Sequence, residues 1–322
     1  MSYIPQRLRL AAFVALALTS VRIGNPQTAN NTSKQSSSFS LKQALAPATP
    51  CRTFQRPIQF FSDTSMLVLS GPSGDCYRSV AQVALNLISM DGHVIARKPW
   101  PSTDPGVVID TERLVLASPT ALEVDGPNLT AIQSIELPSH RFSPSIQRLD
   151  QQGEATISMD GKDYRFGGRP LELLNQPELH QSDATKIVFT FSDGQVIVRR
   201  GESLNVESRG HPIRKIADLG WVLPSCGRYT YCQSYDAGTG IQVSTGRKRR
   251  ILVYSNGSKF PITDAAGLFP YFRLQVFDFD SGAELYREED ITRTGDRSAA
   301  ISPDGDRLAT TDGQKIVVHN LL

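Results

Sequence analysis

The feature that most constrains the fold is a recurring pattern of an apolar strand, a tight turn and a second apolar strand. Near the C-terminal end, the turn of this pattern begins at Ser302 and reads Ser-Pro-Asp-Gly. Proline presets φ at about −65° in a turn, Asp bonds to nearby backbone, and Gly tolerates positive φ. Residues 307–311 and 315–321 then read as two further strands around the hairpin turn Asp312-Gly313. The pattern therefore predicts an antiparallel meander of three strands at this end of the chain.

Six further copies of the pattern lie upstream, with varied fidelity. Residues 157–166, with the sequence ISMDGKDYRF, come nearest to the closing copy. The upstream copies cover residues 60–70, 108–118, 157–166, 191–198, 223–231 and 243–254. If Ser62 and Ser302 mark the first and last turns, the six steps between them average 40 residues. One blade of a WD-type β-propeller needs about 40 to 45 residues, so we expect each copy to mark one blade.

A second repeated element supports this interpretation. Residues 276–285, VFDFDSGAEL, resemble residues 317–322, VVHNLL, and Val276 and Val318 lie 42 residues apart. Through the Ser-Pro-Asp-Gly turn and the Asp-x-x-Ser-Gly hairpin, the chain resembles the WD-repeat and TolB-like family of β-propellers over residues 51–322. The Gly-His and Trp-Asp dipeptides of eukaryotic WD repeats are absent.

The resemblance implies an all-β fold, a β-propeller with seven four-stranded blades. Six and eight blades stay open, because the steps between copies are uneven. A double β-sandwich is the competing interpretation, since any long all-β protein has turns at short intervals. The recurrence of near-identical turns at blade-length offsets favours the propeller.

The closing meander supplies three strands, so its blade lacks a fourth. A bare third strand would expose a row of unpaired backbone groups, which closed architectures avoid. We expect residues 53–58 to pair with residues 315–321 as the outer strand of the last blade, joining the propeller into a ring. Pro57 fits this expectation, because proline is tolerated on edge strands.

The N-terminal residues read as an export signal. Arg7 and Arg9 precede an apolar run of 12 residues, whereas a membrane-spanning helix needs about 20. The sequence therefore predicts a signal peptide over residues 1–24, with an uncleaved anchor as the alternative. A disordered tether rich in Asn, Ser and Thr is expected over residues 25–50, before the propeller domain. The mature protein is expected to be secreted or periplasmic, without stable membrane insertion.

The four cysteines are an even number, which fits an oxidising compartment. We expect two local disulfides, because Cys226 and Cys232 flank a short hairpin and Cys51 and Cys76 bracket the first strands. Unpaired thiols are one alternative. A metal site is another, which is disfavoured because the chain has no paired C-x-x-C and no His close to a Cys.

The sequence predicts no catalytic residue, no metal ligand and no cofactor. It contains no nucleophile elbow, no H-E-x-x-H, no P-loop and no dinucleotide fingerprint. Asp278 and Asp280 invite a calcium interpretation, but alternation of inward and outward residues along a strand explains them better. The basic run over residues 247–250 lacks interleaved aromatic residues, so a solvated loop is favoured over a nucleic-acid site.

Two classes of function remain. The favoured class is a monomeric, non-enzymatic binding scaffold for a protein or glycan partner, with no nucleic-acid partner. Phe269, Tyr271 and Phe272 are its candidate partner contacts, with core filling between blades as the alternative role. The second class is an extracytoplasmic hydrolase or lactonase, with a metal ion held in the central channel by acids from several blades.

Overall fold

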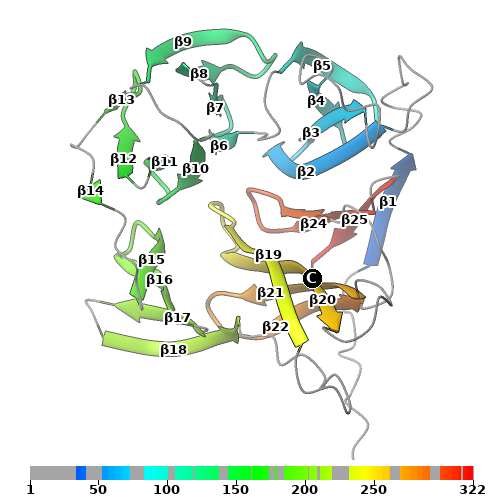
Figure 1. The fold of residues 1–322 in the computed structure, drawn as a ribbon, viewed down its shortest axis with the longest axis vertical. Coiled ribbons are helices and arrows are strands. Elements are labelled where there is room, and N and C mark those ends of the chain that lie inside the picture. Colours follow the sequence, from blue (N-terminus) through cyan, green and yellow to red (C-terminus); the bar gives the residue numbers. More distant parts are fainter. Residues whose placement is uncertain are drawn as a thin grey trace, which may run out of the picture. The chain divides into compact units, whose positions relative to one another are not determined.

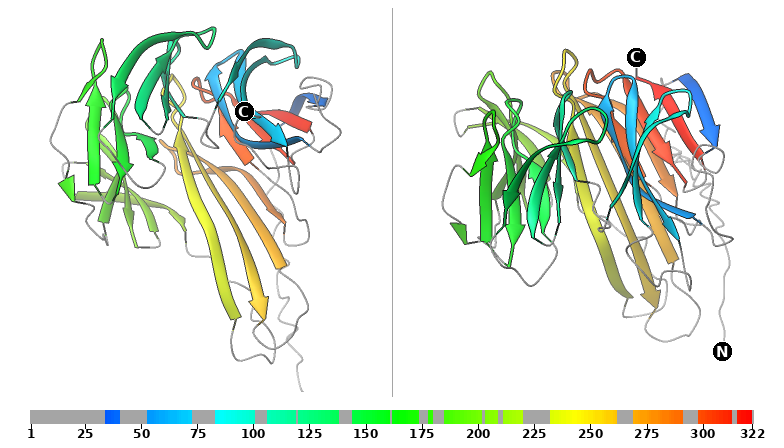
Figure 2. Two further views of the ribbon diagram at one scale, coloured as in Figure 1. Left: turned by 45° about the horizontal axis from the view of Figure 1, so that its top comes forward. Right: turned by 90° about the horizontal axis from the view of Figure 1, so that it is seen from above.

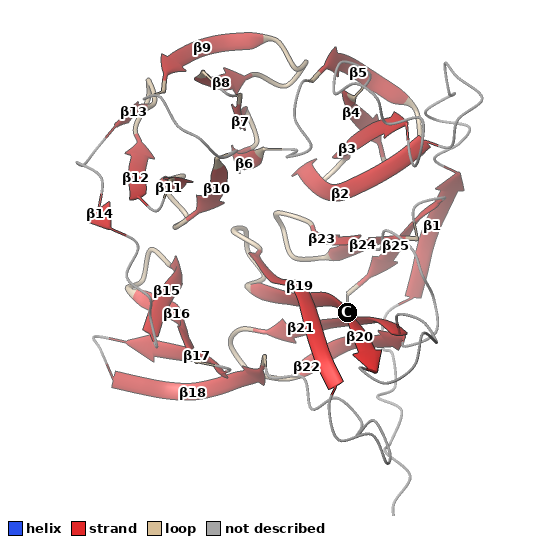
Figure 3. Cartoon of the chain, viewed as in Figure 1, coloured by secondary structure: helices blue, strands red, loops and turns tan. Residues whose placement is uncertain are grey.

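The computed structural model divides the chain into residues 1–30 and residues 31–322, and every described residue lies in the second unit. The structure describes residues 34–40, 53–72, 83–100, 106–118, 120–137, 144–160, 162–173, 178–179, 185–201, 203–208, 211–219, 232–261, 269–290, 298–312 and 315–321. All regular structure in these ranges is β-strand (Figure 3). None of it forms a helix that could span a membrane.

The described strands form six antiparallel sheets set around a common centre, which are the six blades of a β-propeller (Figure 1). Blade 1 contains β2 (Thr53–Ser62), β3 (Ser65–Pro72), β4 (Ala84–Ser89) and β5 (Val94–Pro99). Blade 2 contains β6 (Val107–Asp110), β7 (Arg113–Ala117), β8 (Ala121–Asp125) and β9 (Ala131–Glu136). Blade 3 contains β10 (Ser145–Arg148), β11 (Ala155–Met159), β12 (Lys162–Gly167) and β13 (Glu172–Leu173), with β14 (Glu178–Leu179) also paired to β12.

The second half of the chain repeats this order. Blade 4 contains β15 (Thr185–Thr190), β16 (Gln195–Arg200), β17 (Ser203–Ser208) and β18 (His211–Asp218). Blade 5 contains β19 (Cys232–Val243), β20 (Arg250–Pro261), β21 (Phe269–Asp278) and β22 (Glu284–Asp290). Blade 6 contains β23 (Ser298–Ile301), β24 (Arg307–Thr311), β25 (Lys315–Asn320) and β1 (Lys34–Ser40). The first strand of each of blades 1 to 5, and β23 in blade 6, is the inner strand.

Burial along the strands follows from this arrangement. Middle strands pack between two neighbouring blades, and β7 accordingly has five buried residues in succession. Outer strands have one face in solvent, and β9 alternates exposed and half-buried residues. The sequence meets both needs, with Leu-Val-Leu in β7 and the polar residues Gln133 and Ser134 in β9.

The hydrophobic core is divided into clusters that lie between neighbouring blades. Ile58 and Phe60 of blade 1, for example, share a cluster with Ile316 and Val318 of blade 6. Similar clusters join blades 1 and 2, 2 and 3, 4 and 5, and 5 and 6. No such cluster joins blades 3 and 4 in the described ranges, where hydrogen bonds connect the two inner strands instead.

The expected number of seven blades is wrong. The number seven assumed that every copy of the pattern marks the same turn of its blade. The copy at residues 157–166 instead spans the β11–β12 turn, whereas the other described copies span the turn after an inner strand. The first turn of blade 3 lies at residues 149–154 and has a different sequence. The copy at residues 223–231 lies outside the described residues. Five steps, and not six, therefore separate Ser62 from Ser302.

The prediction that residues 53–58 complete the last blade is also wrong. Residues 53–58 begin β2, the inner strand of blade 1, and pair with β3. Ile58 is fully buried, which suits an inner strand, and Pro57 lies at a shift in the β2–β3 register, where a ladder tolerates proline. The outer strand of blade 6 is β1, which pairs antiparallel with β25 from Lys34↔Asn320 to Ser40↔Lys315.

Part of the expected tether over residues 25–50 is therefore a strand. The segment KQSSSFS is too polar to form a core, but an outer strand needs backbone pairing more than apolar side chains. The predicted signal peptide lies outside the described residues, as do Cys51, Cys76 and Cys226. Only the backbone of Cys232 is described, at the start of β19, so both disulfides remain predictions.

Candidate functional site

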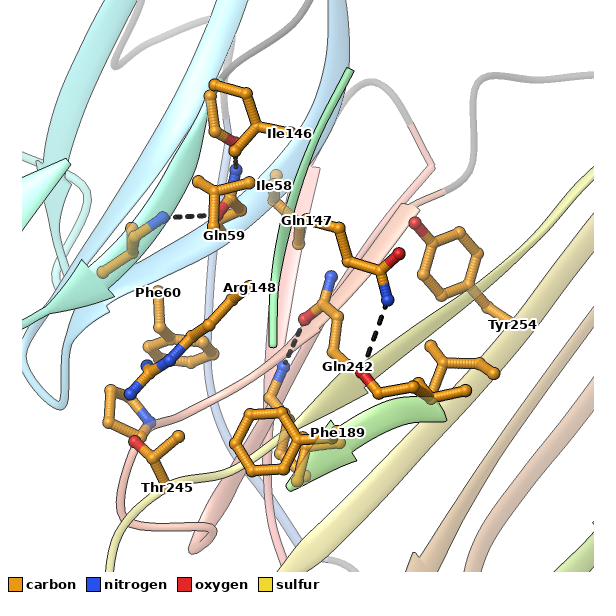
Figure 4. Close-up of a pocket in the computed structure, with 18 residues that line it drawn as sticks. Ile58, Gln59, Phe60, Ile146, Gln147, Arg148, Phe189, Gln242, Thr245 and Tyr254 are labelled. Atoms are coloured by element: carbon orange, nitrogen blue, oxygen red, sulfur yellow. Dashed lines mark hydrogen bonds between the residues drawn. The ribbon is translucent and has the colours of Figure 1, made fainter. Parts of the chain in front are cut away.

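The inner strands of all six blades line a central cavity of about 300 Å³ (Figure 4). Most of the residues that line it are apolar, including Ile58 and Phe60 from β2, Val188 and Phe189 from β15, and Ile301 from β23. Polar atoms nevertheless make up a large share of its surface, and Arg148 is the one charged residue among those that line it. The cavity therefore combines apolar and polar walls with a single cation.

Three glutamines from alternate blades face this cavity, namely Gln59, Gln147 and Gln242 (Figure 4). Nε2 of Gln59 donates to the carbonyl of Gly106 at 2.5 Å, and Oε1 accepts the backbone N–H of Val108 at 3.3 Å. Both partners of Gln59 lie at or beside β6, the inner strand of the next blade. A side-chain amide thus bonds to a neighbouring strand as a backbone peptide would.

Gln242 and Gln147 bridge to the next inner strand in the same way. Nε2 of Gln242 donates to Ala299 at 3.3 Å, and its Oε1 accepts the N–H of Ile301 at 3.3 Å. Nε2 of Gln147 donates to Val188 at 3.4 Å, and no partner of its Oε1 is recorded among the described residues. These bridges hold the inner strands of blades 1 and 2, 3 and 4, and 5 and 6 at fixed separations.

These glutamines are not among the site residues predicted from the sequence, although the chain carries a signal for them. Each follows an isoleucine, as Ile58-Gln59, Ile146-Gln147 and Ile241-Gln242, two or three residues before the turn of its blade. The dipeptide also occurs at Ile132-Gln133 in the outer strand β9, where the Gln133 amide bonds to both backbone groups of Leu171. The Ile-Gln dipeptide therefore marks contacts between blades in this protein.

Arg148 is held at the end of β10 by backbone carbonyls. Its Nε donates to Asp150 at 2.7 Å and its Nη2 donates to Gln151 at 3.0 Å. Burial lowers the pKa of Arg148 to about 10, against the opposing influence of the Asp150 and Asp110 carboxylates. Arg148 therefore keeps its positive charge at neutral pH, but in an environment that solvates the charge poorly.

Tyr254 and Thr245 add two hydroxyl groups to the lining of the cavity. Burial raises the pKa of Tyr254, so its phenol is neutral and can donate a hydrogen bond. Tyr254 is paired with Gly240, away from the β19–β20 turn, whereas Thr245 lies in that turn. The two hydroxyls therefore lie at different depths along the blade 5 wall.

The basic run over residues 247–250 is not simply a solvated loop, contrary to our expectation. Nη1 of Arg249 lies 2.6 Å from a carboxylate oxygen of Asp193 in blade 4, and its Nη2 pairs with Asp280. The guanidinium carbon lies 4.4 Å from the centre of the Phe279 ring. Arg249 therefore connects blades 4 and 5 through ion pairs and an aromatic ring.

The rest of this turn contacts blade 6 and blade 3. Nζ of Lys248 lies 2.5 Å from a carboxylate oxygen of Asp306. The backbone N–H of Gly246 donates to the carbonyl of Pro303 at 2.7 Å, and Nε2 of Gln151 donates to Thr245 at 3.2 Å. Lys248 and Arg249 thus meet acids of the neighbouring blades, and Arg250 meets Asp278 of its own blade, which leaves Arg247 as the exposed member of the run.

The acids that could suggest calcium are used inside the protein. Asp278 accepts the backbone N–H and the hydroxyl of Ser281, both at 2.6 Å, and pairs with Arg250. Within the described ranges, no group of three or more His, Cys, Asp or Glu side chains could hold a metal ion. The channel-metal alternative needs acids on several inner strands, and the described lining of the cavity has none.

The candidate partner contacts do not lie at the cavity. Phe269, Tyr271 and Phe272 belong to β21, opposite Lys259, Gly257 and Asn256 of β20. These three residues lie at the start of β21. Asp278 lies at its other end, where it pairs with Arg250, the first residue of β20. Their backbone is described but their side chains are not, so their role as contacts remains a prediction.

Comparisons with known proteins identify no family for the chain. No protein-family model matches the chain, and no curated protein is significantly similar to it. Solved structures with a similar fold include the WD40 repeats of RRP9, with a TM-score of 0.46 at 9% identity over 90% of this chain and 100% of that one. They also include U3-55K, with a TM-score of 0.44 at 10% identity over 88% and 98% of the two chains.

A third similar structure is hydrazine synthase from Kuenenia stuttgartiensis, with a TM-score of 0.41 at 12% identity over 82% and 76% of the two chains. WD-repeat propellers are thus among the structures that the chain resembles, while the TolB-like part of the resemblance remains a prediction. At these identities and TM-scores the likeness carries no argument about partners or reactions. The fold assignment rests on the six sheets themselves.

Proposed function

We propose that the protein is an extracytoplasmic, monomeric scaffold that binds a protein partner through an extension of blade 5. The observation that carries the proposal is the length of three strands of that blade. β19 and β20 have 12 residues each and β21 has 10, whereas the described strands of the other blades have 8 or fewer, apart from β2 with 10. Figure 2 shows these three strands continuing beyond the ends of the strands in the other blades.

The extension is a continuous sheet rather than a loop. β19 and β20 pair from Val243↔Ile251, beside the turn, to Cys232↔Pro261 at the far end. A strand advances about 3.3 Å per residue, so 12 residues span roughly 40 Å, about twice the length of a six-residue blade strand. Because ladder hydrogen bonds already order these strands, a partner can bind them at a low cost in conformational entropy.

The described side chains of blade 5 join the clusters between blades near the β19–β20 turn. These residues lie between 241 and 286, and those on β20 run from Ile251 to Tyr254, beyond which the side chains of that strand are not described. Phe269, Tyr271 and Phe272 belong to the part of β21 that pairs with the far half of β20. Aromatic residues are enriched among the residues that dominate binding energy at protein interfaces, which supports a contact role for this segment.

The location outside the cytoplasm rests on the predicted signal peptide over residues 1–24 and on the even number of cysteines. The extension contains one of the predicted disulfide partners, Cys232, at its far end. A disulfide to Cys226 would fasten the start of β19 beside the proposed contact segment. Secretion and partner contact therefore support each other in this proposal.

Site-specific photo-crosslinking in the cells that produce the protein tests this function. A photoreactive phenylalanine analogue is placed at Tyr271, and a control copy carries it at Ile132, an exposed residue of β9 in blade 2. We expect a discrete protein adduct from position 271 and none from position 132. Replacing Phe269 and Phe272 by Ala should remove that adduct.

The outcomes separate the proposal from its competitors. An adduct whose mass is twice that of the chain would identify the extension as a self-association surface and would contradict a monomeric scaffold. Equal labelling from both positions would indicate nonspecific contact. Absence of any protein adduct from position 271 would overturn the protein-partner proposal and favour a glycan ligand.

A further inference from the structure

Arg148 is a partly buried cation without an ion-pair partner among the described residues. Two nitrogen atoms of its guanidinium donate to backbone carbonyls, and its third nitrogen, Nη1, has no hydrogen-bond partner among the residues that the structure describes. The more deeply buried Arg113 and Arg250 each pair with a carboxylate. Since buried charges in proteins are normally paired, the charge on Arg148 invites an anion from outside the chain.

The cavity beside Arg148 sets the size and polarity of such an anion. About 300 Å³ corresponds to roughly ten water molecules, enough for a compact organic molecule. Phe60, Phe189 and Ile146 supply apolar contact surface, and no carboxylate is among the described lining residues, although the Asp150 and Asp110 carboxylates act on Arg148 from outside the lining. An inorganic ion would leave most of this surface in contact with water.

The polar groups are distributed along the cavity. Arg148 and Thr245 both belong near the turns of their blades, and Gln151 contacts both of them through its backbone carbonyl and its side-chain amide. Tyr254 lies farther from the turn, and the Oε1 atom of Gln147 is an acceptor without a recorded partner in the described ranges. One end of the cavity therefore suits a negative group, and the other suits a neutral polar group.

We propose that the central cavity binds a small organic carboxylate, whose carboxylate accepts hydrogen bonds from Nη1 of Arg148 and the hydroxyl of Thr245. The apolar body of the ligand lies between the inner strands, against Phe60 and Phe189. This site is independent of the blade 5 extension, so either proposal can fail without the other.

Isothermal titration calorimetry on the full mature chain tests the site with benzoate, and with benzamide and acetate as matched probes. Benzamide keeps the ring but lacks the charge, and acetate keeps the charge but lacks the ring. A charge-assisted hydrogen bond distinguishes benzoate from benzamide, and apolar burial distinguishes it from acetate. We expect benzoate to bind about tenfold or more tightly than either probe.

Two variants assign the binding to Arg148. Arg148→Gln should weaken benzoate binding about tenfold or more and leave benzamide binding unchanged, whereas Arg148→Lys should retain part of the preference for benzoate. Arg199→Gln is the matched control, because Arg199 is exposed and also donates to a backbone carbonyl, that of Gly201. It should bind benzoate as the original protein does.

Thermal melts of the unliganded variants show whether each one is folded. A folded Arg148→Gln variant with unchanged benzoate affinity would overturn the proposal. So would equal affinities for benzoate and benzamide, or no detectable binding of benzoate to the original protein. If acetate bound as tightly as benzoate, the apolar body of the ligand would contribute nothing to binding, and its proposed placement against Phe60 and Phe189 would be wrong.

Discussion

At the scale of single residues, Gly305 shows how closely the blades approach each other. It has a φ of 78° in the turn after β23, and a Cβ atom there would overlap the carbonyl oxygen of Lys248 in blade 5. Glycine is thus needed at this position for two reasons, its backbone conformation and its lack of a side chain. The Ser-Pro-Asp-Gly turn is a contact between blades as well as a turn.

Replacing Gly305 by Ala should lower the melting temperature more than the same change at Gly194. Gly194 has a similar φ of 82° in the turn of blade 4, but a Cβ atom there would meet nothing within 4 Å. We expect Gly194→Ala to cost about 1 kcal/mol of unfolding free energy, from backbone conformation alone. Gly305→Ala should cost on the order of 2 to 4 kcal/mol, because backbone overlap is added. Equal losses in thermal denaturation would show that the approach of Lys248 is not tight.

At the scale of elements, β1 is the segment whose partner is most distant in the sequence. It joins Lys34–Ser40 to β25 at Lys315–Asn320, with six pairs of residues in register. Without it, β25 would present a free edge of backbone N–H and C=O groups to solvent. The polar sequence of β1 contributes pairing rather than core.

Deleting residues 34–40 should therefore destabilise blade 6 and promote aggregation. The lost ladder corresponds to a few kcal/mol of unfolding free energy. Deleting residues 25–31, seven residues that precede β1, is the matched control and should leave the melting temperature unchanged. Light scattering and thermal melts of the two variants measure the difference. Equal behaviour of both variants would mean that β1 does not cover the edge of β25.

The sequence was informative about strands and less so about how the strands are shared between blades. Turn residues and apolar alternation predicted the all-β propeller and located the turns near Ser62, Asp110, Asp193 and Ser302. They could not distinguish the first turn of a blade from its second, and so the count of blades was wrong. The segment KQSSSFS has no apolar alternation, because an outer strand is defined by the edge that it covers.

The candidate site was harder to predict than the fold. Arg148, Thr245 and Tyr254 belong to three different strands or turns, and only the arrangement of the blades around a common centre brings them to one cavity. No short motif encodes such a set of residues. The pairing of Arg249 with Asp193 is likewise invisible in the sequence, because the two residues are 56 positions apart.

At the scale of the whole propeller, the joint between blades 3 and 4 differs from the others. Its described contacts are polar, and include the N–H of Thr190 donating to Leu149 at 2.8 Å and the Gln147 amide donating to Val188. Neighbouring joints bury apolar clusters, such as the one that contains Phe166 and Leu122 between blades 2 and 3. Separating blades 3 and 4, whose described residues share no apolar cluster, should therefore expose less apolar surface than separating other neighbouring blades, and so cost the least free energy.

Hydrogen–deuterium exchange should therefore be faster in β10 and β15 than in β2 and β23. The first two strands flank the polar joint, whereas the second two flank a joint that buries Ile58 and Ala300. Native-state exchange followed by mass spectrometry measures both pairs in one protein, so differences in solution conditions cancel. Equal protection of the two pairs would show that the propeller opens as a unit or opens elsewhere.

The pairing of β1 with β25 also bears on when the protein can finish folding. Ribosomes make β1 long before β25, with 274 residues between Ser40 and Lys315. Blades 1 to 5 each consist of consecutive strands and can form in order as the chain emerges, but blade 6 cannot be completed until its last strand has been made. A nascent chain of this protein therefore carries one strand that waits for its partner throughout synthesis, and that interval is when a chaperone would be of most use to it.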